Sequence, residues 1–151
     1  MFDILIYLFE NYFDSGSYPD PDKLVVKLCA AGFEDEEINQ AVTWLSDLRQ
    51  LSLLEYPVTI NHAGSRCFTQ FEIDRISVDS LHFISFCEQN KIISPVEREM
   101  IIDRALALGR KNLALDNIKL VALMVLWNQH DDLDPMIIED LLTPANSAQI
   151  H

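Results

Sequence analysis

Residues 22–51 constrain the fold more than any other part of this chain. Apolar residues recur there at three- to four-residue spacing on both sides of Gly32, which is the pattern of two helices that each bury one face. A glycine between two such runs is typical of a left-handed helix C-cap. The sequence therefore predicts a helix, a tight turn and a second helix that begins near Asp35 and opens with four consecutive acids: Glu34, Asp35, Glu36 and Glu37.

The residues before and after this helix pair also have helix and strand patterns. Residues 2–13 have helical periodicity, and Asp20-Pro21 supplies an N-cap followed by a proline at the first helical position. Two short β-prone runs within residues 57–68 flank a turn-forming segment, which predicts a small β-hairpin. Three helices followed by a hairpin is the order of elements in a winged helix-turn-helix.

The rest of the chain has helix signals throughout. Thr69 with Glu72 and Ser94 with Glu97 match capping boxes, and a proline follows Ser94 directly. We expect Asp116 to cap the next helix, whose apolar run at residues 120–127 indicates a buried central element. Asp134-Pro135 is expected to open a last short helix.

These patterns predict a mainly α fold in two lobes. The first, residues 1–69, resembles a winged helix-turn-helix with a small β-hairpin, and the second, residues 70–151, is α-helical. A single continuous domain is the alternative, because 151 residues fit either one domain or two small lobes.

The chain is strongly acidic. It has 11 Lys and Arg residues against 24 Asp and Glu residues, for a net charge of -13, and residues 1–50 contain ten acidic and three basic side chains. Affinity for phosphate backbones comes mainly from Lys and Arg, so direct nucleic-acid binding is not expected. Solubility alone explains the charge as well as a selected partner does.

The acidic residues Glu34, Asp35, Glu36 and Glu37 are the candidate partner-docking residues. Carboxylates gathered at one end of a helix could dock a basic protein surface. They also stabilise the positive end of the helix dipole, an explanation that requires no partner and that we prefer on sequence grounds.

Several catalytic and cofactor-binding patterns are absent. The four glycines are too far apart to form a phosphate-binding loop, no His is followed by Glu, and no serine has the Gly-x-Ser-x-Gly context. We therefore expect no enzyme activity and no cofactor.

The sequence contains two sets of possible metal ligands. The pairs His62/Cys67 and His82/Cys87 contain ligand types that suit zinc, but their spacing does not, so a buried Cys87 with exposed histidines is the preferred interpretation. His130-Asp131-Asp132 is better explained as the polar end of a helix. No metal site is expected.

The Gly32-Phe33 turn has a second interpretation. A helix, a Gly-aromatic loop and another helix also occur in ubiquitin-associated-like modules, which bind proteins through the loop, whereas a C-cap glycine with its hydrophobic contact explains the same residues.

The basic residues in the second half of the chain are interleaved with acids, which indicates a solvated, mixed-charge helix face. They are Lys91, Arg98, Arg104, Arg110 and Lys111.

Cysteine content and hydropathy favour the cytoplasm. The three cysteines are an odd number at wide spacing, which is typical of a reducing compartment. The apolar run at residues 120–127 is far shorter than the ~20 residues of a membrane span. The apolar N-terminus contains Asp3 and Glu10, so we interpret it as a core helix rather than a signal peptide.

Several motifs together resemble the bacterial Smg family. They are the opening Met1 to Glu10, Ala31-Gly32-Phe33 leading to residues 41–45, Arg66 to Thr69, Arg98 to Leu108, and Leu120 to Asn128. One departure is Phe71-Glu72-Ile73, where a more acidic helix start would match better. The resemblance implies a cytoplasmic bacterial protein of unassigned molecular function, often encoded near genes for DNA processing and topoisomerase, and it carries over no catalytic residue.

The functional hypothesis from the sequence is a non-enzymatic, acidic protein-interaction or adaptor protein, with a protein as its partner and a possible link to DNA-processing machinery. The alternative is a winged-helix nucleic-acid-binding regulator, which would need a basic face that residues 36–51 do not offer. A metal-dependent enzyme is the third and least supported class.

Overall fold

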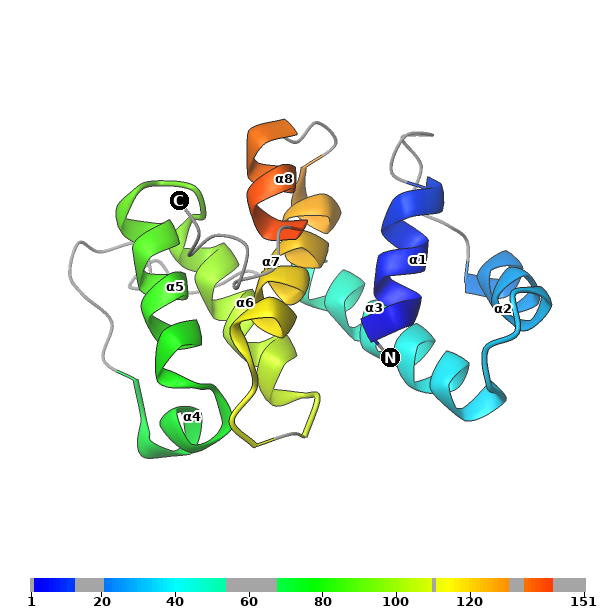
Figure 1. Ribbon diagram of the computed structural model, residues 1–151, viewed down its shortest axis with the longest axis horizontal. Helices are drawn as coiled ribbons and strands as arrows, with labels where there is room; N and C mark the ends of the chain where they lie inside the picture. The colour runs from blue at the N-terminus through cyan, green and yellow to red at the C-terminus, as the bar shows by residue number, and fades with distance from the viewer. Residues whose placement is uncertain (1, 13–20, 54–67, 110, 131–134, 143–151) are drawn as a thin grey trace, which may run out of the picture. The chain divides into compact units, whose positions relative to one another are not determined.

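The structure, a computed structural model of the chain, describes residues 2–12, 21–53, 68–109, 111–130 and 135–142. These residues form eight α-helices and no β-strand, which confirms the prediction of a mainly α fold (Figure 1). The chain divides into two compact units, Met1–Leu53 and Leu54–His151. The expected lobes 1–69 and 70–151 stay a prediction, because residues 54–67 lie outside the described residues.

The expected β-hairpin also falls almost entirely outside the described residues. It was placed within residues 57–68, of which only Phe68 is described, and the helix α4 (Gln70–Arg75) begins two residues later. The winged-helix interpretation therefore stays a prediction.

The first unit is built from three helices: α1 (Phe2–Tyr12), α2 (Pro21–Ala30) and α3 (Asp35–Leu53). α3 contacts both α1 and α2. Each helix buries one face, as the 3.6-residue periodicity predicts. The buried side chains are Ile4, Leu5, Leu8, Phe9, Leu24, Leu28, Ile38, Ala41, Trp44, Leu45 and Leu48.

The turn between α2 and α3 is a Schellman cap. Gly32 has φ +96°, its N–H donates to Cys29 O at 3.2 Å, and the N–H of Phe33 donates to Leu28 O at 3.3 Å. The Phe33 ring meets the Tyr7 ring of α1 edge-on, with centroids 5.7 Å apart. The predicted left-handed glycine cap is confirmed, and the contact of the Phe33 ring connects it to α1.

The second unit surrounds one buried helix. α7 (Leu115–Gln129) contacts α5 (Val78–Gln89), α6 (Pro95–Leu106) and α8 (Pro135–Leu142). Every residue from Ile118 through Trp127 is buried, which confirms the prediction of a central helix. A helix that is apolar on all sides is stable only where neighbours cover all of it.

Two helix starts in this unit follow the predicted capping boxes. At α4, the Thr69 Oγ accepts from the Glu72 N–H at 3.2 Å and the Glu72 carboxylate accepts from the Thr69 N–H at 2.9 Å. At α6, the same exchange joins Ser94 and Glu97, with distances of 3.1 and 2.8 Å, and proline occupies the first turn. Both helix starts follow from residues three positions apart.

The start of α7 differs from its prediction. Its N-cap is Ala114, without a side-chain hydrogen bond, and Asp116 lies within the first turn, so the prediction that Asp116 is the cap was wrong. An isolated parallel bridge pairs Leu113 with Ile76, and the Leu113 N–H donates to Arg75 O at 2.8 Å. This long-range contact fixes the backbone just before the helix, which then begins earlier than the local sequence indicates. Asp116 still favours the helix through the dipole.

Candidate interaction surface

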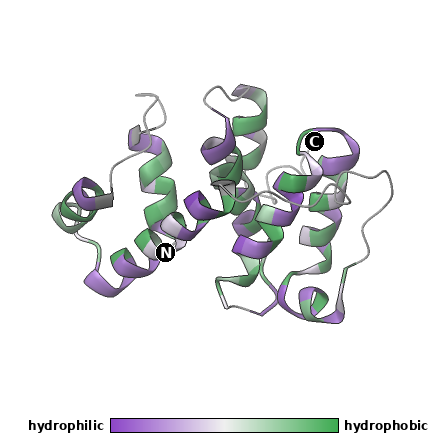
Figure 2. Cartoon of the chain, turned by 180° about the vertical axis from the view of Figure 1, so that it is seen from behind, coloured by the Kyte–Doolittle hydropathy of each residue, from purple (hydrophilic) through white to green (hydrophobic). Residues whose placement is uncertain are grey.

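The candidate docking residues gather at the N-terminal end of α3. The Ile38 N–H donates to Glu34 O at 3.0 Å, so the helical hydrogen bonding begins within this acidic segment. The first turn carries the acids at the positive end of the helix dipole. The structure thus brings all four predicted residues to one helix end, drawn in hydrophilic purple in Figure 2. We call this group the acidic cluster: Glu34, Asp35, Glu36 and Glu37.

The acidic cluster faces solvent. Three of its side chains are exposed and Glu37 is half-buried. Asp35 accepts a weak hydrogen bond from the Cys29 thiol of α2, with Sγ 3.8 Å from Oδ1. None of the four carboxylates forms an ion pair with any residue in the described part of the chain.

The remaining exposed face of α3 is polar rather than basic. It presents uncharged side chains together with Asp47 and Arg49. With Asp35 and Glu36 included, the exposed residues of α3 have three acids and one base. A helix that contacts phosphates through this face would meet like charge, which disfavours nucleic-acid binding by α3.

Two arginines of the second unit are buried and paired with acids of the same unit. Arg98 is 7% exposed and pairs with Glu88 of α5, and its Nε lies 2.7 Å from a Glu99 oxygen. Arg104 is also 7% exposed, with its Nη2 2.8 Å from an Asp103 oxygen. The prediction that these arginines lie on a solvated face was wrong, although their pairing with neighbouring acids is observed. Burial requires such pairing, because an unpaired buried charge is strongly destabilising.

A glutamate–histidine pair joins the ends of two helices. Glu97 is 6% exposed, and its second carboxylate oxygen lies 2.7 Å from Nε2 of His130, the C-cap residue of α7. The sequence identified Glu97 as a capping residue and His130 as the end of a helix, but it gave no sign that the two meet, because 33 residues separate them. Asp131 and Asp132 lie outside the described residues.

The possible zinc ligands are only partly described. Cys87 is buried at 3% exposure and His82 is exposed, as expected for this pair, whereas His62 and Cys67 lie outside the described residues. Within the part of the chain that is described, no three His, Cys, Asp or Glu side chains gather in a way that could hold a metal ion.

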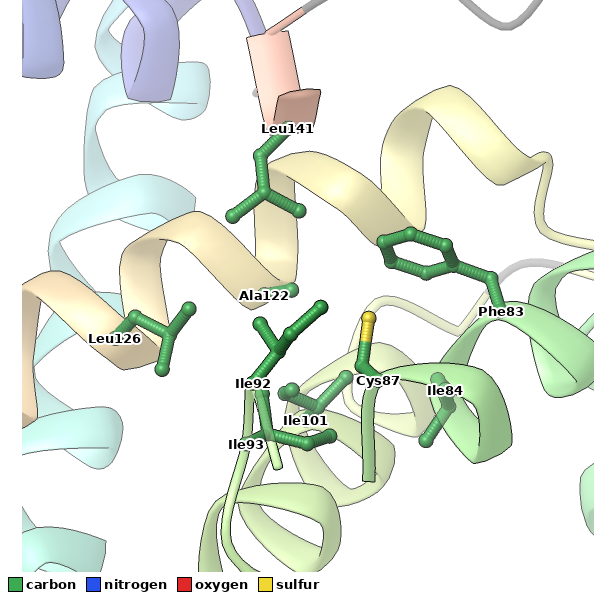
Figure 3. Close-up of a pocket in the computed structure, with 9 residues that line it drawn as sticks. All are labelled: Phe83, Ile84, Cys87, Ile92, Ile93, Ile101, Ala122, Leu126 and Leu141. Atoms are coloured by element: carbon green, nitrogen blue, oxygen red, sulfur yellow. The ribbon is translucent and has the colours of Figure 1, made fainter. Parts of the chain in front are cut away.

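A small apolar cavity lies among the helices of the second unit (Figure 3). Its volume is about 10 Å³, enough for roughly one water molecule and far below the ~300 Å³ of a typical ligand pocket. Leu141 of α8, Phe83 of α5 and Leu126 of α7 are among the residues that line it, and the Cys87 thiol points towards α7. This cavity is a packing defect rather than a binding site for an organic molecule.

Membrane insertion finds no support among the described helices. None of them has the length and apolar character that a helix needs to cross a bilayer.

Comparison with known proteins identifies relatives over the full length. A family model described as "Protein of unknown function (DUF494)" matches residues 1–151. The chain is 41% identical over 151 residues to a "Protein Smg homolog" of Methylobacillus flagellatus, with all of both chains covered. It is 43% identical over 152 residues to the Nitrosomonas europaea "Protein Smg homolog", again with both chains covered completely. No solved structure matches.

Proposed function

The chain belongs to the DUF494 family, which includes the Smg homologues, and on that premise we propose that it is a non-enzymatic protein-interaction protein that docks a basic partner on its acidic cluster. The single observation that carries the proposal is the position and exposure of the acidic cluster, Glu34, Asp35, Glu36 and Glu37. They converge on one helix end, three of them are exposed, and none is ion-paired with a described residue.

Acids at helix starts of the second unit provide a comparison for the acidic cluster. There, Glu72 and Glu97 also stand at helix starts, but both are buried and accept hydrogen bonds from their own N-cap residues. Among the described residues, the carboxylates of the acidic cluster accept no such hydrogen bond from a helix start, and Asp35 accepts only the weak one from the Cys29 thiol. Four clustered carboxylates create a negative potential that raises the encounter rate with a basic surface and selects against acidic ones.

The remaining parts of the proposal follow from the family resemblance and the composition. We place the protein in the cytoplasm, linked to DNA-processing machinery through a protein contact rather than through DNA. Cys29 and Cys87 carry free thiols, which is compatible with a reducing compartment.

A winged-helix nucleic-acid-binding regulator is the alternative. Its support is the contact between α2 and α3, the two helices that would form the helix-turn-helix motif. The three acids and one base on the exposed residues of α3 oppose it. A gel shift in ~50 mM salt distinguishes the two, because a phosphate-binding protein binds tightest at low salt. A saturable shift there would favour the regulator over the adaptor.

The direct test compares two triple variants with equal loss of charge. The first, Glu34→Gln/Glu36→Gln/Glu37→Gln, neutralises the acidic cluster. The control neutralises three exposed acids that lie outside the cluster and form no ion pair with a described residue: Asp3, Glu10 and Asp74. Each tagged protein is crosslinked in its own bacterium and purified, and the bound proteins are quantified by mass spectrometry.

We expect a stoichiometric partner with a basic surface to be recovered with the wild type and with the control, and to fall at least ~10-fold with the cluster variant, as several charge pairs at an interface are lost. The recovery should also decrease as the salt of the wash rises from ~0.05 to ~0.5 M. Equal losses in both triple variants would show that net charge, rather than the acidic cluster, governs the interaction.

A further inference from the structure

α4 is a six-residue helix that is held in place at both ends. An isolated helix of this length is not stable in water, so its neighbours must hold it. At its start, the capping box of Thr69 and Glu72 closes the first turn. At its end, Arg75 O accepts from the Leu113 N–H at 2.8 Å, and the parallel bridge joins Ile76 to Leu113. α4, drawn in green below α5 in Figure 1, therefore presents the side chains of its outer side in a fixed position.

An exposed aromatic ring and an arginine lie together on that outer side. Phe71 and Arg75 are about one helical turn apart, and the guanidinium carbon Cζ of Arg75 lies 3.6 Å from the centroid of the Phe71 ring. Phe71 is 53% exposed and Arg75 is half-buried. A planar guanidinium stacked on a ring keeps its N–H donors at its edge, where they remain accessible. We call these two residues the α4 stack.

The guanidinium of the α4 stack has no acidic partner among the described residues. The side chain of Arg75 forms no hydrogen bond or ion pair with any of them. This distinguishes it from Arg98 and Arg104, which pair with acids of the second unit. The N–H donors of a guanidinium form a planar fork that can bind both oxygens of a carboxylate. The Phe71 ring thus positions the guanidinium, while the described residues leave its donors unused.

The tertiary structure brings a second base to the end of α4. Lys111 directly precedes Asn112, whose N–H donates to Asp74 O at 3.3 Å. The Lys111 side chain is exposed and forms no ion pair with a described residue. Asp74 is the acid next to Arg75 in the sequence, and its carboxylate accepts from Gln70 Nε2 at 2.9 Å on the neighbouring side of α4. Two bases and one acid give this surface a positive charge, in a chain whose net charge is -13.

We propose that the α4 stack and Lys111 form a docking site for an acidic segment of a partner protein, with a carboxylate on the Arg75 guanidinium and an apolar side chain against the exposed part of the Phe71 ring. The positive charge of the site selects carboxylates, and the exposed ring selects an apolar neighbour, a combination that a protein segment supplies. Aromatic and arginine side chains are enriched at the energetic centres of protein interfaces. A guanidinium already held by a ring also loses little freedom when it binds.

A nucleic acid fits this site less well than a protein segment does. Phosphate backbones bind through many Lys and Arg contacts, whereas the site has two bases beside an acid. The net charge of -13 also repels a long polyanion more strongly than it repels a short segment with one or two carboxylates. The site lies in the second unit and attracts the charge opposite to the one that the acidic cluster attracts, so it does not rest on the proposed function.

A short fluorescent peptide of alternating glutamate and leucine tests the proposal. Fluorescence anisotropy with the full chain at ~0.05 M salt should give a saturable curve with a Kd between ~10 μM and ~1 mM, the range of a small, weak site. Arg75→Gln should weaken binding at least ~5-fold, because the carboxylate loses its bidentate partner. Lys91→Gln is the matched control, because it removes one exposed base just after α5 in the same unit. It should bind the peptide as the wild type does.

Two further variants separate the α4 stack from charge alone. Arg75→Lys keeps the charge but loses the planar guanidinium, so it should recover only part of the affinity. Phe71→Ala should weaken binding at least ~3-fold without a change in net charge, because the apolar contact is lost. The nuclear magnetic resonance signal of the Arg75 Nε–H group, identified by its absence in Arg75→Gln, should shift when the peptide is added. Far-ultraviolet circular dichroism of each variant establishes that the helices are intact.

Three results would overturn the proposal. A wild-type chain that does not bind the acidic peptide up to ~1 mM has no such site. Equal losses with Arg75→Gln and Lys91→Gln would show that net charge, rather than the α4 stack, governs binding. A single-stranded oligodeoxythymidine that binds more tightly than the peptide, and is lost with Arg75→Gln, would make a nucleic acid the occupant.

Discussion

Acidic side chains lie at the starts of both α3 and α6, but they are exposed at α3 and buried at α6. At α6, Glu97 is 6% exposed and its two carboxylate oxygens bind the Ser94 N–H and His130. At α3, Glu36 and its acidic neighbours face solvent. An acid at a helix start is locally favourable in both places, because of the helix dipole. At α6 that acid joins two helices, whereas among the described residues the contact from the start of α3 to another helix is the weak hydrogen bond from the Cys29 thiol to Asp35.

This difference distinguishes buried charges, which affect the stability of the fold, from exposed charges, which another molecule can contact. The charged groups of the second unit that are buried are also paired, so we expect their removal to be costly in stability. The exposed acids of the acidic cluster are expected to contribute little to folding. The chain has one tryptophan in each unit, Trp44 in α3 and Trp127 in α7, so the unfolding of each unit can be followed separately.

The largest effect is expected in the buried central helix. Leu123→Ala, at a fully buried position of α7, should lower the free energy of unfolding of the second unit by about 3 to 5 kcal/mol, since it removes apolar contacts and leaves a cavity. Urea unfolding followed by Trp127 fluorescence in a Trp44→Phe background measures it. Val78→Ala, at a position of α5 that is 58% exposed, should change the stability of the same unit by less than about 0.5 kcal/mol.

The next largest effect is expected at the start of α6, and it is compared with the same substitution at the start of α3. Glu97→Ala should destabilise the second unit by about 2 kcal/mol, because it removes the capping box and leaves the Ser94 N–H without its partner. His130→Ala should cost less, about 1 kcal/mol, because the capping box survives. Equal costs for Glu97→Ala and Glu36→Ala in their own units would show that the contrast between the helix starts is wrong.

Two helix ends offer a smaller comparison. Gly32 and Lys91 occupy the same position of a Schellman cap, with φ +96° and +59°, and in both caps the following N–H donates back to the helix, at Leu28 and at Cys87. Gly32→Ala should destabilise the first unit by about 1 kcal/mol, and Lys91→Gly should stabilise the second by about 0.5 to 1 kcal/mol. Thermal unfolding of each variant measures both changes. A destabilising Lys91→Gly would mean that the lysine side chain contributes more than its backbone strain costs.

The smallest effect concerns the acidic cluster itself. Glu36→Gln should lower the stability of the first unit by only a few tenths of a kcal/mol, the contribution of one exposed acid to the helix dipole. Because salt screens this interaction, the loss should shrink between ~0.02 and ~0.5 M salt when it is followed by Trp44 fluorescence. A loss above ~1.5 kcal/mol that salt does not reduce would indicate that Glu36 has a structural partner.

The features that the sequence predicted correctly are local. The capping boxes at Thr69 and Ser94, the glycine cap at Gly32 and the buried run within α7 each depend on residues a few positions apart. Short-range hydrogen bonds and helical periodicity determine such features in almost any surroundings. The acidic cluster was identifiable for the same reason, because four consecutive acids at a helix start necessarily share one end.

The tertiary structure decided what those local elements meet. The contact of His130 with Glu97, the burial of Arg98 and Arg104, and the replacement of Asp116 by Ala114 as N-cap depend on segments distant in the sequence. A charged residue on a helix has the same local pattern whether it faces water or a neighbouring helix. The sequence by itself therefore determined the family, the mainly helical composition, the two capping boxes and the Gly32 cap. Packing between helices determined the start of α7 and which charges are buried, because burial is a property of the assembled unit rather than of any one segment.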